Sequence, residues 1–333
     1  MISRLVVEER RSSIVENYHP INYVILNKQK EIKYSSGDIE SPVYFRSAAK
    51  PLQAIPAFLA GAPKAYHLTE NEAALFCASH RGENIHQKQL RRLIGKLKIS
   101  EERLVCNHSY PLNTKPKEEL IWRREKKRRL LHNCSGKHAG MIAASRLNGW
   151  DENGYEKENH PLQKQIHHII KELSECRDGD MIVGLDGCGV PTLAIPLYNL
   201  ALTYLKFVCL EYVSDPLLKG GIEEVGRVMN QAPEMIASNK FICTELLRDS
   251  NIIAKGGAEG VYTFALRKEK VSIALKVTSG SEVVWPIVIT HILEKLSYSN
   301  VDTITRLKET FPAIRFNDAG AKTGYLTVRE EVY

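Results

Sequence analysis

The sequence predicts an α/β fold of the α+β kind, with one antiparallel sheet built from both ends of the chain, helices on it, and an inserted helical lobe. Two observations predict it. Residues 3–36 alternate β-branched and polar positions and strand-like stretches return at 252–275, whereas the segment between them has the apolar spacing of helices. We therefore expect a discontinuous sheet lobe of residues 1–45 and 248–333 and a mainly helical lobe of residues 46–247.

The composition is that of a globular protein of about two domains. The chain has 333 residues, of which 43% are hydrophobic, and 46 Lys and Arg against 39 Asp and Glu give a formal charge of +7. No apolar run approaches the roughly 20 residues that span a bilayer, and the N-terminal residues lack the apolar core of a signal peptide. We expect a cytoplasmic protein with no membrane partner.

Strands are predicted at both ends of the chain. An N-terminal antiparallel meander has its apolar centres at residues 5–7, 13–15 and 23–26. Its turn signals are Asn17, His19, Pro20 and Asn27. Further strands are predicted at 252–254, 261–266 and 271–275, and an apolar helix follows near 283–296.

Helices are predicted where apolar residues recur every three or four positions. Such spacing occurs at Leu90, Leu93, Ile94 and Leu97, and again at Leu162, Ile166, Ile169, Ile170 and Leu173. Pro161 suits the first turn of the second helix. Thr69 and Glu72 form a capping box, so we expect a helix that runs on as far as Ser79 and His80.

The cysteines and the basic stretches carry weaker signals. Seven cysteines are too few for a disulfide framework in a chain of this length, so we expect reduced thiols. Residues 88–103 hold six Lys or Arg against two acids, and residues 115–132 hold eight against three. Because only Trp122 offers an aromatic platform there, we interpret both stretches as solvated helix faces and expect no nucleic-acid partner.

The first candidate site is Ser47 with Lys50, three residues apart where the helical pattern begins. Positions i and i+3 share a helix face, so the lysine amine can reach the serine hydroxyl. To act as a base the lysine must be neutral, which requires its pKa to fall by roughly 3 units from about 10.4. The pair alone does not establish an active site, and Pro56 would kink a helix that begins at Ser47.

Two cysteine-bearing segments form the second candidate. Gly136-Lys137 superficially suggests a phosphate-binding loop, but the first glycine and the metal-binding hydroxyl of that motif are missing. Gly136 and Gly140 instead indicate a helix packed closely on a neighbour, with its polar side chains on one side, namely Cys134, Lys137 and His138. A glycine-rich turn carries Asp186 and Cys188. Two thiols and a nitrogen could form a zinc site with an open fourth position, or each segment could be an ordinary structural one.

A lysine on a predicted strand is the third candidate. Lys255 precedes Gly256 and Gly257, which would let a ligand approach the backbone. The literal Lys-Thr-Gly at residues 322–324 is a competitor, and both resemble an element of the serine penicillin-recognising enzymes.

Taken in order, five motifs span nearly the whole chain. They are Arg46-Ser47-x-x-Lys50-Pro51-x-Gln53, Cys77-Ala78-Ser79-His80-x-Gly82-Glu83, Asn133-Cys134-Ser135-Gly136-Lys137-His138-Ala139-Gly140, Asp186-Gly187-Cys188-Gly189-x-Pro191 and Lys255-Gly256-Gly257-Ala258-Glu259-Gly260. Together they closely resemble the L-asparaginase II family of the rhizobial, thermolabile type. This is not the bacterial asparaginase type with threonine nucleophiles.

The resemblance implies a serine β-lactamase-like fold with the active site between two lobes, and hydrolysis of L-asparagine by a homodimer. It implies two catalytic serine–lysine pairs, Ser47 with Lys50 and Ser79 with Lys255. It implies zinc as cofactor, held by Cys134, Lys137 and Cys188. The positions that it assigns to the substrate pocket are Arg46, His80, His138 and Asp186.

Our hypothesis is that Ser47 attacks the side-chain amide, Lys50 takes its proton, and Ser79 with Lys255 relays a proton to the leaving ammonia. Zinc would anchor the substrate through Asp186, His138 and a bound water. One alternative is another amide or peptide hydrolase of the same fold, such as a glutaminase or a D-amino-acid amidase. A second is a non-enzymatic metal- or nucleic-acid-binding protein.

Overall fold

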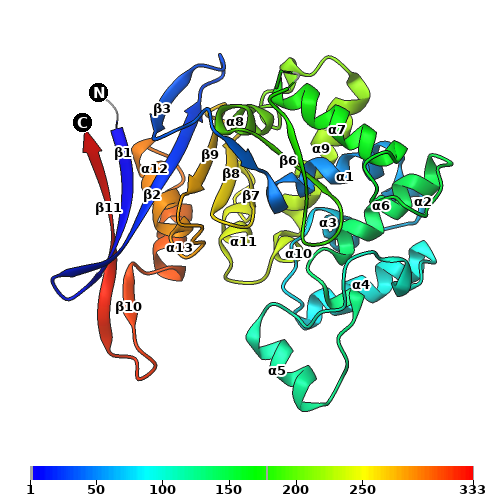
Figure 1. Cartoon of the computed structure of the whole chain (residues 1–333), viewed down its shortest axis with the longest axis horizontal. Coiled ribbons are helices and arrows are strands. Elements are labelled where there is room, and N and C mark those ends of the chain that lie inside the picture. Colours follow the sequence, from blue (N-terminus) through cyan, green and yellow to red (C-terminus); the bar gives the residue numbers. More distant parts are fainter. Residues whose placement is uncertain (1–2, 178, 333) are drawn as a thin grey trace.

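The computed structural model describes residues 3–177 and 179–332, and it contains one large antiparallel sheet built from both ends of the chain (Figure 1). In spatial order its strands are β10 (Ile314–Phe316), β11 (Lys322–Val332), β1 (Ser3–Arg11), β2 (Ile14–Leu26), β9 (Val271–Val277), β8 (Val261–Leu266) and β7 (Ile252–Gly256), and β3 (Ile32–Ser36) also pairs with β2. The predicted α/β class and the sheet shared by the two ends are confirmed. The exact lobe boundaries stay a prediction.

The second strand differs from the prediction, because Asn17, His19 and Pro20 lie inside β2 and not in turns. Pro20 has no N–H to donate. It is tolerated because pairing of β2 with β9 begins only at Ile21, and the Pro20 carbonyl accepts a hydrogen bond from the Thr278 N–H. The predicted turn at Asn27 is confirmed, since the chain reverses there between β2 and β3.

Two strands of a second, three-stranded sheet lie within the segment predicted to be helical. Its order is β4 (Pro42–Tyr44), β6 (Pro191–Pro196) and β5 (Ile182–Leu185), so the middle of the chain is not purely helical. The apolar run before Asp186 is an edge strand of this sheet.

Helices fill the rest of the chain. They are α1 (Lys50–Leu59), α2 (Ala62–Ala65), α3 (Glu70–Ala74), α4 (Asn84–Leu97), α5 (Thr114–Trp122), α6 (Ser135–Leu147), α7 (Pro161–Ser174), α8 (Leu197–Leu205), α9 (Pro216–Gln231), α10 (Pro233–Ile236), α11 (Ile242–Leu247), α12 (Trp285–Lys295) and α13 (Val301–Thr310). Helices α4, α7 and α12 confirm the predictions from apolar spacing, with Pro161 in the first turn of α7. None of the helices in the described part of the chain is long and apolar enough to cross a membrane.

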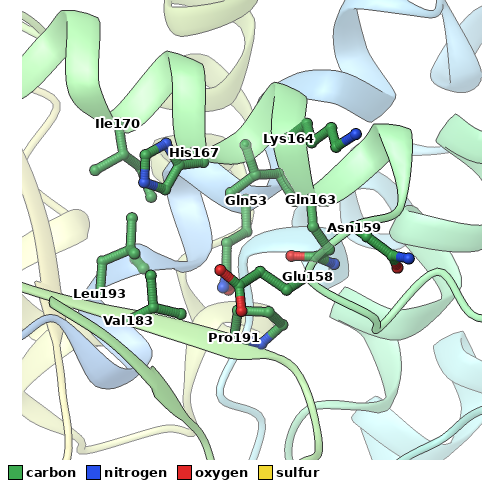
Figure 2. A pocket seen from close by; sticks show the side chains of 12 residues that line it. Gln53, Glu158, Asn159, Gln163, Lys164, His167, Ile170, Val183, Pro191 and Leu193 are labelled. Carbon is green, nitrogen blue, oxygen red and sulfur yellow. The ribbon is translucent and has the colours of Figure 1, made fainter. Parts of the chain in front are cut away.

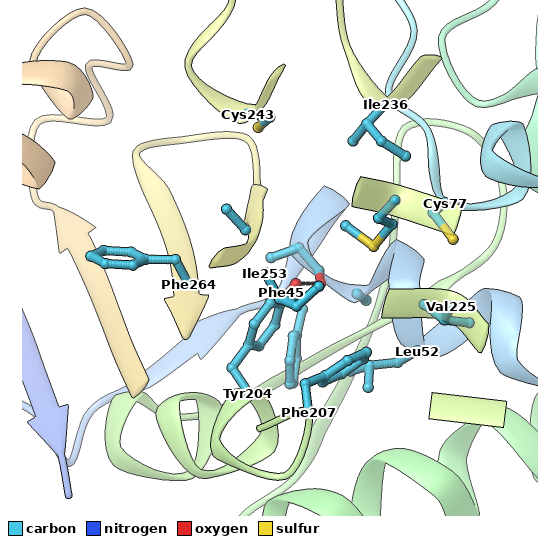
Figure 3. Packing of buried hydrophobic residues seen from close by; sticks show 14 of the residues in the cluster. Phe45, Leu52, Cys77, Tyr204, Phe207, Val225, Ile236, Cys243, Ile253 and Phe264 are labelled. Atoms are coloured by element: carbon cyan, nitrogen blue, oxygen red, sulfur yellow. Dashed lines mark hydrogen bonds between the residues drawn. The ribbon is translucent and has the colours of Figure 1, made fainter. Parts of the chain in front are cut away.

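Strands β7, β8 and β9 are covered on both faces. Tyr262 of β8 packs edge-on against Trp285 of α12, whereas the neighbouring Thr263 faces Tyr204 of α8. Successive side chains of a strand point to opposite faces, so a strand covered on both sides is apolar throughout. Tyr204 stacks on Phe207, and both lie beside Phe45 at the junction with the helical region (Figure 3). This junction fixes the segment that carries Ser47 and Lys50.

Candidate active site

Ser47 lies on a tight turn that joins β4 to α1. The turn is a 3₁₀ helix, η1 (Arg46–Ala49), and α1 starts at Lys50, so Pro56 falls six residues into α1. The Tyr204 hydroxyl donates a hydrogen bond of 2.8 Å to the Ala48 carbonyl and holds the turn against α8. Arg46 adopts a left-handed backbone conformation, with φ of 49°, which is uncommon outside glycine and is kept only where the surroundings enforce it.

The buried Lys50 amine contacts the second serine of the predicted site. Its Nζ lies 2.7 Å from the Ala78 carbonyl oxygen, 3.2 Å from the Asn133 carbonyl oxygen and 2.9 Å from Ser79 Oγ. No hydrogen bond joins it to Ser47 among the residues that the structure describes, and the Ser47 hydroxyl makes none there with any other group. The expected contact within the pair is therefore replaced by a contact between the two pairs.

Ser79 is held by an extended segment, not by a helix. The predicted capping box at Thr69 starts α3, but the helical turns end at Cys77, in the 3₁₀ helix η2 (Leu75–Cys77). The expectation of a helix through Ser79 is wrong because the Ser79 N–H donates to the Ile236 carbonyl, 2.8 Å away. This strand-like contact turns the Ser79 hydroxyl toward the lysines.

Lys255 reaches the same hydroxyl from β7. Its Nζ lies 2.9 Å from Ser79 Oγ and 2.8 Å from the Gly256 carbonyl oxygen. Burial, together with the nearby charge of Lys50, lowers the pKa of Lys255 to about 8. The competing Lys322 begins β11, separated from β7 by β1, β2, β9 and β8 in the sheet, so it belongs to no such site.

The two glycines after Lys255 serve packing. A Cβ atom on Gly257 would lie 2.6 Å from the Phe45 carbonyl oxygen, so only glycine lets the end of β7 approach η1 this closely. The expected room for a ligand is partly taken up by the chain itself. The result is that Lys255 and Ser47 share one cavity.

That cavity has a volume of about 110 Å³ and is lined by both serines, by Lys255 and by two charged residues that were not predicted, Arg81 at the unspecified position of the second motif and Glu282. Arg81 donates a 2.6 Å hydrogen bond to Asn113 and lies over the Phe241 ring. The Glu282 carboxylate has no hydrogen-bond or ion-pair partner in the described residues, and burial raises its pKa. Arg81 and Glu282 therefore face the cavity with opposite charges that do not neutralise each other directly.

The predicted zinc ligands come together beside this cavity. Cys134 precedes α6, Lys137 lies in its first turn, and Cys188 lies in the turn between β5 and β6. Lys137 Nζ is 2.9 Å from Cys188 Sγ, the two thiols contact each other, and all three residues are at least 96% buried. Burial alone would lower the pKa of Lys137, but the two sulfur atoms outweigh it and raise this pKa.

Two thiols and an amine that converge in this way would, once deprotonated, suit a tetrahedral zinc ion with an open position. No group of three His, Cys, Asp or Glu side chains is arranged for a metal in residues 3–177 or 179–332, so Lys137 is essential to the set. The buried Nε2 atom of His138, on the same helix, has no hydrogen-bond partner among the residues described. The residues present therefore fit the metal that the motifs imply.

The four residues expected at the substrate lie in different surroundings. Asp186 accepts a 2.9 Å hydrogen bond from Arg46 Nε, which links the turn before Cys188 to the turn that carries Ser47. His138 contacts the Tyr155 hydroxyl at 2.8 Å. His80 is fully buried, with Nε2 2.9 Å from Ser135 Oγ. None of these four residues lines the cavity that contains Ser47 and Ser79.

A comparison with protein families shows to which family the chain belongs. The model of the L-asparaginase II family matches residues 7–328. The chain belongs to this family. As an L-asparaginase II family member, the protein is an enzyme, an amidohydrolase. No curated protein matches it.

Solved structures are similar to this family member only in outline. A β-lactamase from Mycobacterium bovis is 11% identical, over 83% of this chain and 94% of that chain, with a TM-score of 0.41. A Bacillus glutaminase is 11% identical, over 84% and 92% of the two chains, with a TM-score of 0.40. The protein Mglu is 13% identical, and the alignment covers 83% of this chain and 64% of that one, with a TM-score of 0.39. At these scores the likeness carries no conclusion about activity.

Two residues that line the cavity of this L-asparaginase II family member, Arg81 and Glu282, were not predicted from the sequence. Arg81 follows the Ser79-His80 motif directly, and its place in an extended segment, where side chains alternate, would have put it on the side of Ser79. Glu282 lies just before α12 and belongs to no motif, so no signal in the sequence points to it.

Proposed function

We propose that this protein hydrolyses L-asparagine to L-aspartate and ammonia through its two serine–lysine pairs. The observation that carries the proposal is the position of Ser79 Oγ, 2.9 Å from both Lys50 Nζ and Lys255 Nζ, in a small cavity that also contains Ser47. Hydroxyls beside buried amines are activated nucleophiles and proton carriers in acyl transfer.

Ser47 is the nucleophile in this proposal. Its hydroxyl lines the cavity and has no partner among the described residues, so the oxygen is open to the amide carbon of a substrate. When Ser47 Oγ bonds to that carbon, its proton passes to Lys50, three residues along, once the Lys50 amine has given its own proton through Ser79 to Lys255. Catalytic hydrogen bonds of this kind are often formed only once substrate is bound.

Ser79 is the proton relay. A hydroxyl has one proton, so it donates to one of the two lysine amines and accepts from the other. Lys255, in its ammonium form, supplies through Ser79 the proton that the amide nitrogen needs as the carbon–nitrogen bond breaks and ammonia leaves. The proton that Lys50 gained then returns along the same chain to Lys255. Water then attacks the aspartyl ester: its oxygen bonds to the acyl carbon, one of its protons restores the Ser47 hydroxyl as the ester bond breaks, and the other leaves with the new carboxyl group.

Arg81 and Glu282 suit the amino-acid end of the substrate. L-Asparagine carries an α-carboxylate and an α-ammonium group, and the cavity offers a guanidinium and an unpaired carboxylate. A buried guanidinium binds a carboxylate with charge-assisted hydrogen bonds, and a carboxylate does the same for an ammonium group. This pairing favours a free amino acid over a peptide as substrate.

Zinc would be held by Cys134, Lys137 and Cys188. When bound, it supplies a fixed positive charge close to Asp186 and His138. The chain's own contribution is the Arg46–Asp186 ion pair, which ties the metal-binding turn to the nucleophile's turn and orients both.

The test is ammonia release from L-asparagine and, separately, from L-glutamine by the purified protein, beside Ser47→Ala and Ser79→Ala. We expect L-asparagine turnover that both substitutions reduce by at least about 100-fold. Turnover of L-glutamine alone would make the protein a glutaminase. No turnover of either amide, with both variants folded, would overturn the proposal.

A further inference from the structure

A second and larger cavity lies beside the start of α1, and it shares no lining residue with the cavity that contains Ser47 and Ser79. Its volume is about 570 Å³, within the usual range for small-molecule sites, and it lies between α1, α7 and the three-stranded sheet (Figure 2). Ala49 and Gln53 line it, on either side of Lys50 in the sequence. The start of α1 therefore carries both the proposed base and part of the wall of this cavity.

Gln53 is a largely buried polar side chain that lines this cavity. Its side chain is only 7% exposed, it lines the cavity, and it makes no hydrogen bond with another described residue. Gln163 of α7 is 5% exposed and donates to the Tyr155 carbonyl, but its amide oxygen accepts nothing within the described ranges. No atom of either amide is both fully buried and without a partner, so the free polar atoms of these two side chains are accessible and can hydrogen-bond to a ligand in the cavity.

Charged groups of both signs stand at the mouth of the cavity. Glu158 reaches across it toward Gln53 and Pro191 (Figure 2). Lys164 and His167, one helical turn apart on α7, also line it. None of these three side chains forms an ion pair in the part of the chain that the structure describes. An ammonium group suits Glu158, and a carboxylate suits Lys164 and His167.

The inner walls are apolar. They are formed by the buried aliphatic side chains of Ile166, Ile170 and Leu193 and by Val183, which is exposed at the edge strand β5. Figure 2 shows Ile170, Val183 and Leu193 together on one side of the amides. A ligand that fills the cavity therefore has an apolar body and a head that carries both charges.

We propose that this cavity is a second binding site, distinct from the active site, for an α-amino acid with an apolar side chain. Its ammonium group meets Glu158, its carboxylate meets Lys164 and His167, and its side chain lies against the aliphatic wall. The site is independent of the function proposed above, since binding requires no turnover.

Binding of a ligand at this site would affect the active site. Gln53 is three residues from Lys50 on α1, so a ligand that engages Gln53 bears on the helix that carries the base. A neighbouring hollow, which shares Glu158 and Val183, continues to Gly189 in the turn that holds Cys188. Such coupling is reciprocal in its effect on binding at the two sites.

The test is calorimetric titration of the full chain with L-phenylalanine, with and without saturating L-aspartate. We expect saturable binding that L-aspartate does not compete away. Val183→Trp fills the cavity from the half-exposed strand β5 and should weaken binding at least tenfold, whereas Ile182→Trp, on the opposite face of the same strand, should change it less than twofold. Glu158→Gln should weaken binding about tenfold, and Glu118→Gln on the exposed face of α5 is its matched control.

Three results would overturn the inference. The first is no saturable binding of L-phenylalanine up to about 10 mM. The second is full displacement by L-aspartate, which would mean that the probe occupies the active site. The third is equal binding by Val183→Trp and Ile182→Trp when circular dichroism shows both to be folded. Loss of asparagine turnover in Ser47→Ala bears on none of these results, so the two proposals fail separately.

Discussion

Lys255 Nζ lies 2.9 Å from Ser79 Oγ, although 176 residues separate the two in the sequence. The contact joins β7 of the large sheet to the segment after η2 of the helical region. Since Lys50 reaches the same oxygen, the two lysines form one hydrogen-bonded chain through a single hydroxyl. The groups in such a chain titrate together, so the pH dependence of turnover reports on the whole chain and not on one lysine.

The pH dependence of turnover should show the titration of this chain. The proposed mechanism needs one proton shared by the two lysines, and the first proton is lost with the Lys255 pKa of about 8. We expect kcat/KM for L-asparagine to rise with pH up to about 8 and then to level off, and Lys255→Ala to lower kcat by about 10²–10⁴-fold. A rate that is greatest near pH 6 and falls through pH 8 would contradict this assignment.

Glu282 should recognise the α-ammonium group of the substrate. Loss of one charge-assisted hydrogen bond costs about 1.5–3 kcal/mol, so Glu282→Gln should raise the KM for L-asparagine roughly tenfold or more. Succinamate, which lacks the amino group, should show nearly the same KM with both proteins. Glu309→Gln, on the exposed face of α13, is the control. Equal effects on both substrates would show that Glu282 acts in some other way.

Gly136 should be essential to the packing under the site. A Cβ atom there would lie 2.3 Å from the Leu75 carbonyl oxygen, so α6 must move away from η2. We expect Gly136→Ala to lower the free energy of unfolding by about 1–3 kcal/mol in urea denaturation. Gly220→Ala in α9, where a Cβ meets nothing within 4 Å, should instead raise it by about 0.5–1 kcal/mol. Equal effects of the two substitutions would contradict the packing argument.

Metal content should depend on the two thiols beside Lys137. Elemental analysis of protein purified with zinc present should find zinc in the wild type and little in Cys134→Ser or Cys188→Ser, because a serine hydroxyl binds zinc poorly at neutral pH. Cys209→Ser, at a buried cysteine next to α8, should keep it. Wild-type protein without zinc, or Cys188→Ser with full zinc, would rule out this ligand set.

Local patterns predicted much of the fold. The strands β7, β8 and β9 and the helices α4 and α7 have periodicities that depend only on neighbours in the sequence. The unbroken course of β2 through Pro20 could not be predicted, because it depends on where β9 stops pairing, about 250 residues away. The helix end at Cys77 likewise depends on the distant Ile236 carbonyl.

The sequence predicted which residues form the candidate site better than it predicted which of them are in contact. The motifs supplied Ser47, Ser79 and both lysines, but spacing paired Ser47 with Lys50, whereas the amine contacts Ser79. Such contacts depend on side-chain rotamers and on how segments distant in the sequence pack together, and a sequence pattern predicts neither. The basic stretches 88–103 and 115–132 contain cations that form ion pairs, such as Arg128 with Glu101. The absence of a nucleic-acid partner stays a prediction.

The most direct test of the central claim is to trap the covalent intermediate. Acid quenching during L-asparagine turnover, followed by proteolysis and mass spectrometry, should find an aspartyl ester on the peptide that contains Ser47, and Ser47→Ala should abolish it. An ester on Ser79 would reverse the proposed roles of nucleophile and relay. Steady turnover with no ester on either serine would contradict covalent catalysis by the serine–lysine pairs.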